Sequence, residues 1–156
     1  MKEIKEERFG TERALYASRG LKLQNCRFEG AEDGESALKE SRDICAQDCF
    51  FALRYPLWHV RTAVLENCEM TDTCRAALWY DSDLTIRGCT LGGIKAVREC
   101  RGVKIEKTRI DSPEFGWKSR NISLHDSSLV SEYAFLESRN IRAEGLTFTG
   151  KYSFQY

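Results

Sequence analysis

The feature that most restricts the fold of this chain is an internal repeat of about 19 to 23 residues that occurs seven times. Every copy has the same order of residue types: apolar, any residue, apolar, two polar, one small, any residue, apolar. Apolar residues two positions apart lie on the same face of a β-strand. The polar pair is rich in Asn, Asp and Gly, which tolerate tight bends, as in Gln24-Asn25 and His125-Asp126. Each copy therefore predicts two short strands that meet at a corner.

The aligned copies place residues of one kind in columns that should point inward. The first apolar column is Leu21, Ile44, Ala63, Leu84, Val103, Ile122 and Ile141. The second is Leu23, Ala46, Leu65, Ile86, Ile105, Leu124 and Ala143. The mostly small column is Cys26, Cys49, Cys68, Cys89, Thr108, Ser127 and Leu146. The last is Phe28, Phe51, Met70, Leu91, Ile110, Leu129 and Phe148. Such columns are typical of a solenoid, in which each coil packs on its neighbours.

A third strand-like segment precedes each copy, at residues 14–16, 37–39, 56–58, 77–79, 96–98, 115–117 and 134–136. Three short strands separated by turns describe a triangular coil whose like positions stack about 4.8 Å apart in parallel sheets. We therefore predict one all-β domain, a right-handed parallel β-helix of about seven three-strand coils over residues 14–153. Residues 1–13 would form an N-terminal cap, and residues 154–156 would begin a further, uncapped coil.

The leucine-rich repeat is the main alternative, because its L-x-x-L-x-L-x-x-N/C-x-L core matches the middle of the pattern, cysteine column included. Two observations favour the β-helix. A 19-residue turn leaves little room for an outer helix. The leading leucine of that motif also falls on residues that are mostly small or polar: Ser18, Ser41, Val60, Asp81, Cys100, Ser119 and Ser138.

Charge and cysteine usage narrow the classes of partner. Lys+Arg 24 balances Asp+Glu 24, so the whole molecule would not be steered toward nucleic acid or a membrane, and we expect neither partner. The start of the chain has no apolar signal segment, and no apolar run approaches the roughly 18 residues that span a bilayer. Seven cysteines without a CxxC pair favour reduced structural thiols, with no metal or other cofactor. These features predict a cytoplasmic protein.

Several phrases of the sequence resemble a known family. ERALYASRGLKLQNCRFEG, GESALKESRDI, YPLWHVR, AALWYDSDLTI and KYSFQY are similar to the bacterial domain of unknown function 3737. The resemblance runs from about Phe9 to Tyr156, and it implies a right-handed β-helix grouped with pectin-lyase-like folds. Members of that family continue for several more turns, so the resemblance implies a fragment or a shortened member. Its motifs are repeated rather than catalytic and imply no activity.

One outward column combines aromatic and basic side chains, and we call it the aromatic stripe: Tyr16, Lys39, Trp58, Trp79, Arg98 and Trp117. Aromatic rings can lie against sugar faces, and the cations between them can pair with carboxylates or phosphates, so the stripe is the candidate ligand-binding site. The alternative is that the indoles fold over the corner to cover core while the cations extend past them into solvent.

A second outward column, the arginine column, carries one arginine in six of the seven copies: Arg19, Arg42, Arg61, Arg101, Arg120 and Arg139. It could form a ridge that binds anions. We favour instead a solvated face on which these arginines pair with nearby acids such as Asp43, Asp83, Glu99 and Glu137.

The sequence shows no catalytic constellation. Glycoside hydrolysis needs two carboxylates about 5 to 10 Å apart, and the outward strand columns contain no adjacent pair. Asp81 and Asp83 are expected as turn formers. His59 shares a column with Glu40, Tyr80 and Glu99, which would allow a base supported by a carboxylate.

We therefore expect a non-enzymatic scaffold that binds a carbohydrate or a protein through the aromatic stripe, with no catalytic residue and no metal. The alternative is a carbohydrate-active enzyme, a lyase or glycosidase of the pectin-lyase-like group. We also expect self-association through the uncapped C-terminal end, because unpaired strand edges and an open apolar core need covering.

Overall fold

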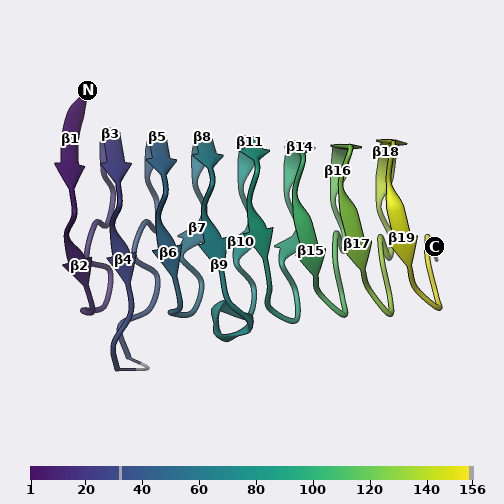
Figure 1. Cartoon of the computed structure of the whole chain (residues 1–156), viewed down its shortest axis with the longest axis horizontal. Helices are drawn as coiled ribbons and strands as arrows, with labels where there is room; N and C mark the ends of the chain where they lie inside the picture. Colours follow the sequence, from purple (N-terminus) through teal and green to yellow (C-terminus); the bar gives the residue numbers. More distant parts are fainter. Residues whose placement is uncertain (32, 155–156) are drawn as a thin grey trace.

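A computed structural model describes residues 1–31 and 33–154, which wind as a stack of β-coils along one long axis (Figure 1). The strands pair in parallel and form three sheets, and the described residues contain no α-helix, only the short 3-10 turn η1 (Asp72–Cys74). No helix in these ranges is long and apolar enough to span a membrane. The predicted all-β parallel β-helix is confirmed.

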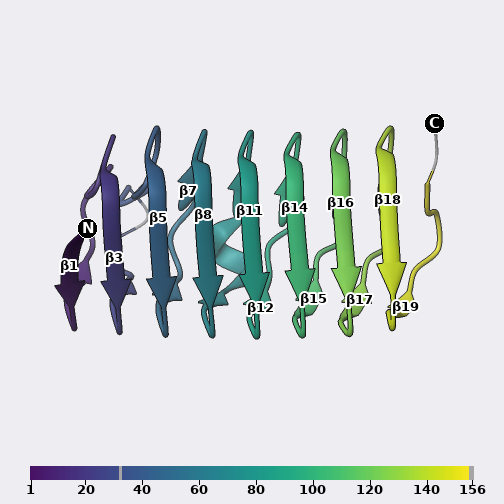
Figure 2. The same ribbon diagram turned by 90° about the horizontal axis from the view of Figure 1, so that it is seen from above.

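Sheet A is the largest surface of the coil, and Figure 2 shows its strands side by side. Its eight strands in spatial order are β1 (Lys2–Lys5), β3 (Arg19–Gln24), β5 (Arg42–Gln47), β8 (Arg61–Glu66), β11 (Ser82–Arg87), β14 (Arg101–Glu106), β16 (Arg120–His125) and β18 (Arg139–Glu144). Sheet B holds the short strands after the first corner: β2 (Arg8–Phe9), β4 (Arg27–Phe28), β6 (Phe50–Phe51), β9 (Glu69–Met70), β12 (Thr90–Leu91), β15 (Arg109–Asp111), β17 (Ser128–Val130) and β19 (Thr147–Thr149).

Sheet C is the third side of the coil, and it is a regular sheet only in the middle of the stack. It contains β7 (Leu57–Trp58), β10 (Leu78–Trp79) and β13 (Val97–Arg98), and an isolated bridge extends it from Arg98 to Trp117. In the outer coils the same segments are turns that still hydrogen-bond to the next coil, as from Leu15 N to Ala37 O at 2.8 Å. The third predicted strand is thus present in the central coils, while the outer ones keep its position without its regular form.

The register matches the columns read from the sequence. Leu21 pairs with Ile44, Leu84 with Val103, and Phe28 with Phe51. These columns are buried and form one continuous core, in which Phe28 and Phe51 stack with ring centroids 4.7 Å apart. In-register stacking of apolar columns buries most of each inward side chain between two coils, which is the main source of stability in a solenoid.

Residues 2–9, expected as part of a cap, form a coil of their own, so sheets A and B have eight strands where seven coils were predicted. Ile4 pairs with Leu23 and Phe9 with Phe28. The repeat pattern did not include this coil because Lys2 and Glu7 occupy its first apolar position and its small position. Lys2 and Glu7 are exposed in the structure, so these two positions are not part of the buried core. At the other end Phe154 stacks on Phe135, and residues 155–156 lie outside the described residues.

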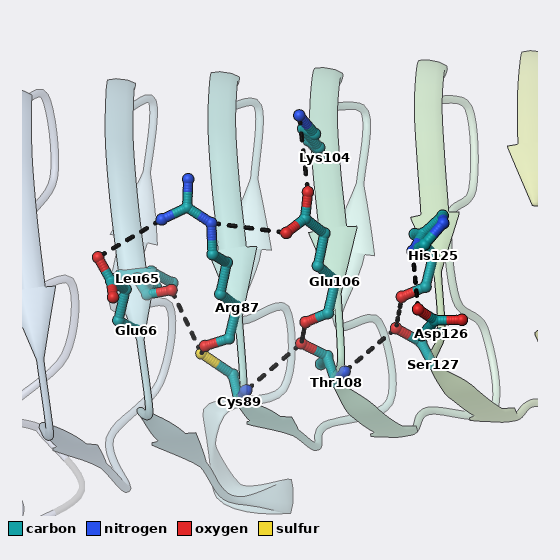
Figure 3. Close-up of polar contacts among 10 residues, drawn as sticks. All are labelled: Leu65, Glu66, Arg87, Cys89, Lys104, Glu106, Thr108, His125, Asp126 and Ser127. Carbon is teal, nitrogen blue, oxygen red and sulfur yellow. Dashed lines mark hydrogen bonds and ion pairs between the residues drawn. The ribbon is translucent and has the colours of Figure 1, made fainter. Parts of the chain in front are cut away.

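The small column joins the coils by hydrogen bonds at the first corner (Figure 3). Cys89 N–H donates to Thr108 Oγ1 at 3.3 Å, and Thr108 N–H donates to Ser127 Oγ at 3.1 Å. The side chains donate in turn to carbonyls, as from Cys89 Sγ to Leu65 O at 3.5 Å. Each small polar side chain therefore satisfies backbone groups that the corner removes from the sheets, which gives the cysteine column a structural role.

Candidate functional site

A groove of about 710 Å³ follows the corner where the chain leaves the third side of the coil and enters sheet A. Three columns of side chains line it, each contributing one residue per coil. We call them the turn wall, which comes directly after the aromatic stripe, the floor, and the arginine wall, which is the part of the arginine column within the groove. Because the columns repeat, the groove is long and open rather than a closed pocket.

The turn wall is built from residues in the left-handed region, with φ between 50° and 62°: Glu40, His59, Tyr80, Glu99, Lys118 and Glu137. None of them is Gly, Asn or Asp, the residues that adopt this conformation most readily. A left-handed backbone costs such residues about 1–3 kcal/mol each. The corner therefore holds charged and aromatic side chains in a conformation that a small turn residue would adopt with less strain.

Two of these side chains stack on each other in neighbouring coils. The rings of His59 and Tyr80 have centroids 5.0 Å apart and planes 5° from parallel. Hydrogen bonding to Glu99 raises the pKa of the Tyr80 phenol. Burial raises the pKa of Glu99, but hydrogen bonds from Tyr80 and from Arg98, whose Nε lies 3.1 Å from Glu99 Oε1, together hold that pKa below its ordinary value. Glu99 is thus an ionised acceptor within a polar network.

The floor is a column of inward side chains, of which Asp81 and Ser119 accept a hydrogen bond from a backbone N–H of the coil before: Val60, Asp81, Cys100 and Ser119. Cys100 N–H donates to Ser119 Oγ at 3.2 Å, and Val60 N–H donates to Asp81 Oδ1 at 2.7 Å. Asp81 lies at the corner between β10 and β11, where a turn former was expected, and at 1% exposure its side chain is buried. The sequence held the signal, because the other copies carry mainly Ser, Cys or Val at this position.

Asp81 is the one carboxylic acid of the floor. Burial raises its pKa well above the ordinary range, although the backbone N–H groups of Val60 and Trp79 lower it. Its Oδ2 is buried and has no hydrogen-bond partner in residues 1–31 and 33–154. A buried carboxylate without an ionic partner is unstable relative to the neutral acid. Asp81 is therefore held as a neutral acid just below the groove surface.

The arginine wall consists of like charges in register. Arg61 pairs with Ser82 and Ser82 with Arg101, and Arg101, Arg120 and Arg139 follow in consecutive coils. All four arginines are exposed. The ion pairs of the described residues include none of them, and none of Arg19 or Arg42. The expected pairing of this column with Asp43, Asp83, Glu99 and Glu137 is thus not formed.

The other end of the same strands behaves differently (Figure 3). There Arg87 lies between two acids of the neighbouring coils, 3.6 Å from Glu66 and 3.6 Å from Glu106. His125 Nε2 and Glu144 follow at 3.8 Å. At the C-terminal edge of sheet A, charges of opposite sign therefore alternate and form ion pairs. At its N-terminal edge, the positive charge of arginine repeats without ion pairs among the described residues.

The aromatic stripe lies beside the turn wall, and its centre is a closed stack. The indoles of Trp58 and Trp79 have centroids 4.9 Å apart and planes 7° from parallel. Lys39 Nζ lies 4.1 Å from the Trp58 ring centroid, and the Arg98 guanidinium lies 5.8 Å from that of Trp79. Stacking between coils thus covers the indole faces with each other and with the two cations. Both rings are half-buried.

The structure does not bring the whole stripe together. Trp117 Nε1 donates to Tyr133 O, and its ring has Lys95 Nζ at 5.9 Å from the centroid. Tyr16 is 49% exposed, with the Arg13 guanidinium 5.5 Å from its ring. No ring contact joins either one to the Trp58–Trp79 stack in the described part of the chain. Sequence reasoning placed His59, Tyr80, Glu99 and Glu40 in one column but missed Lys118 and Glu137, which continue it.

No group of three or more His, Cys, Asp or Glu side chains in the described ranges is arranged to hold a metal ion. A family model described as "Protein of unknown function (DUF3737)" matches residues 2–156. A comparison with curated proteins gave no match.

Proposed function

Since this chain belongs to the DUF3737 family of proteins of unknown function, we propose from its geometry that it is a binding scaffold that takes an extended carbohydrate along the groove. One observation carries the proposal. The turn wall supplies one groove-lining side chain from each of six consecutive coils, from Glu40 to Glu137, so the groove suits a linear ligand rather than a compact one.

The chemistry of the walls favours a carbohydrate over a protein. Ionised carboxylates such as Glu99 accept hydrogen bonds from hydroxyls, and guanidinium groups such as Arg101 donate to ligand oxygens. Charged residues are depleted at the cores of protein–protein interfaces, whereas both walls of this groove are rich in them. The tryptophan faces are covered, so the stripe would support the turn wall from behind and sugar binding would rest on hydrogen bonds.

A matched pair of tyrosine variants tests the proposal on a glycan array. Tyr80 is 40% exposed and stacks on His59 at 5.0 Å, and Tyr133 is 39% exposed and stacks on Tyr152 at 5.1 Å, away from the groove. We expect Tyr80→Ala to weaken glycan binding about tenfold and Tyr133→Ala to leave it unchanged. Equal losses in the two variants, or no glycan bound by the wild type, would count against carbohydrate binding in this groove.

One observation favours a second candidate, a glycosidase. A neutral acid and an ionised carboxylate in one site are the pair that glycoside hydrolysis uses, and Asp81 and Glu99 are such a pair. The buried position of Asp81 Oδ2 argues against direct contact with a sugar. Sugar release from a polysaccharide panel, with and without calcium, tests this candidate. Release that disappears in Asp81→Asn would replace the binding proposal with catalysis.

A further inference from the structure

We infer that the carbohydrate taken by the groove is an acidic glycan, whose carboxylate or sulfate groups bind the arginine wall. This inference rests on the proposed function and adds to it the chemical class of the ligand. It depends on the arrangement of charges along sheet A.

Positive charge repeats along the arginine wall without ion pairs to other described residues. Arg101, Arg120 and Arg139 occupy consecutive coils in register, where like positions lie about 4.8 Å apart. Like charges directly opposite each other on neighbouring strands destabilise a sheet. No carboxylate of the described residues forms an ion pair with these guanidinium groups. No direct ion pair therefore relieves their mutual repulsion, and solvent ions or an anionic ligand can do so.

The two edges of sheet A differ in whether their charges form ion pairs. At the C-terminal edge of sheet A, Glu66, Arg87 and Glu106 alternate in sign and pair across three coils (Figure 3). At this edge neighbouring coils thus neutralise each other's charge. At the N-terminal edge the chain keeps the positive charges free, and that edge is also the one that borders the groove.

The side chains and spacing of the groove suit a glycan better than other anionic polymers. Proteins that bind single-stranded nucleic acid present aromatic faces on which bases stack, whereas here His59 and Tyr80 cover one another. An extended acidic peptide repeats its same-side residues about every 6.7 Å, which does not match coils about 4.8 Å apart. A sugar acid carries its anion on one edge and hydroxyls on the other, and the groove offers arginines on one wall and the carboxylates of Glu40, Glu99 and Glu137 on the other.

The test is calorimetric titration of the full chain with hexameric oligogalacturonate, its fully methyl-esterified form and a heparin hexasaccharide. A uridine hexanucleotide and a hexaglutamate peptide represent the other polymer classes. The variant Arg101→Gln/Arg120→Gln removes two charges from the arginine wall. Its control, Arg109→Gln/Arg142→Gln, removes two exposed charges outside the groove, neither of which forms an ion pair within residues 1–31 and 33–154.

We expect oligogalacturonate, the heparin hexasaccharide or both to bind. Tighter binding of oligogalacturonate would indicate that carboxylate is recognised, and tighter binding of the heparin hexasaccharide would indicate sulfate. The methyl ester should bind at least tenfold more weakly than oligogalacturonate if carboxylate is the anion recognised. The wall variant should weaken binding about tenfold and make the slope of log affinity against log salt shallower by roughly one to two, because fewer counterions are released. The control should stay within about twofold of the wild type.

Other results overturn the inference in distinguishable ways. A neutral ester that binds as well as both acidic glycans would leave carbohydrate binding in place and remove the requirement for charge. No binding of any glycan would overturn the proposed function as well. Tighter binding of the nucleotide or the peptide would reassign the ligand class. Equal losses in the wall variant and its control would show that only net charge matters, and circular dichroism of both variants verifies that they fold.

Discussion

The backbone N–H of Val60 donates to Asp81 Oδ1 in the next coil at 2.7 Å, and this bond places a carboxylic acid where later coils use a serine hydroxyl. The corresponding bond two coils later, from Cys100 N–H to Ser119 Oγ at 3.2 Å, is made by an uncharged side chain. The same backbone group is thus satisfied in both coils, but only Asp81 must stay protonated to remain buried.

Replacing Asp81 with Ser should therefore stabilise the protein, by about 1–3 kcal/mol at neutral pH, because it removes a buried unsatisfied oxygen and keeps an acceptor for Val60 N–H. The effect should depend on pH. Burial raises the pKa of Asp81 in the folded chain, so the folded state binds a proton that the unfolded state has already released above pH about 4. The wild type should lose stability relative to the variant as pH rises from there.

Urea denaturation of both chains between pH 4 and pH 8 measures this difference, with Asp81→Asn as a neutral control of nearly the same shape. Parallel stability curves for the wild type and Asp81→Ser would show that Asp81 is not held neutral.

Loss of the central tryptophan should destabilise the fold. Trp79 stacks on Trp58 and contacts Tyr55 and Arg98, so Trp79→Ala removes a ring packed between two coils. We expect a loss of about 2–4 kcal/mol of unfolding free energy. Tyr16→Ala, at the exposed end of the stripe, should stay within about 0.5 kcal/mol of the wild type. Chemical denaturation measures the unfolding free energies of the two variants. A small loss of stability in Trp79→Ala would make Trp58 and Trp79 candidates for direct contact with a ligand.

Repulsion between the arginines of the wall should lower the unfolding free energy at low ionic strength, and added salt should remove this loss. Arg120 lies between Arg101 and Arg139, so Arg120→Gln should raise the unfolding free energy by about 0.2–0.5 kcal/mol at low ionic strength. At 0.5 M NaCl the gain should vanish, because exposed charges are screened. Arg87→Gln is the opposite case, since Arg87 pairs with Glu66 and Glu106, and it should lower stability slightly in low salt. If both Arg120→Gln and Arg87→Gln raised the unfolding free energy at low salt, or if neither did, the two edges of sheet A would not differ in their electrostatics as described.

The thiols should differ in reactivity because of access. Cys45 is half-buried on the outer face of sheet A, and the other six cysteines are buried. Burial raises the pKa of Cys74 to about 12. A hydrogen bond from Cys68 lowers the pKa of Cys49 to about 7, but Cys49 is 3% exposed, so reagents cannot reach it. A disulfide reagent at pH 8 should therefore modify one thiol quickly, and Cys45→Ala should abolish that phase. A fast phase that persists in Cys45→Ala would indicate local opening at the cysteine column.

Much of the architecture could be read from residue order alone. Apolar residues two positions apart, such as Leu84 and Ile86, identify an inward strand face, and the recurrence of that pair every coil identifies a solenoid. The predicted partners Leu84 and Val103 are indeed paired. The coil at residues 2–9 was not predicted because Lys2 and Glu7, which are exposed in the structure, break the pattern.

The candidate site was less predictable, because its properties arise between coils. The columns of Trp58 and of Arg101 were visible in the sequence, but residue order does not show whether two stacked side chains cover each other or remain available. Trp58 and Trp79 close against one another, whereas Arg101 and Arg120 stay unpaired. The burial of the Asp81 side chain was not predicted for a related reason, since a polar residue beside a turn usually faces solvent.

Residue order is sufficient to predict the period, the columns and the face on which each strand residue lies, because alternation along a strand is a local property of the backbone. The neighbours that satisfy, cover or oppose each side chain became evident only in the folded chain. Those neighbours lie one coil away along the chain. Residue order does not show that the Val60 N–H reaches the Asp81 carboxyl or that the Arg87 guanidinium reaches Glu66 and Glu106, because these contacts depend on how side chains orient between coils.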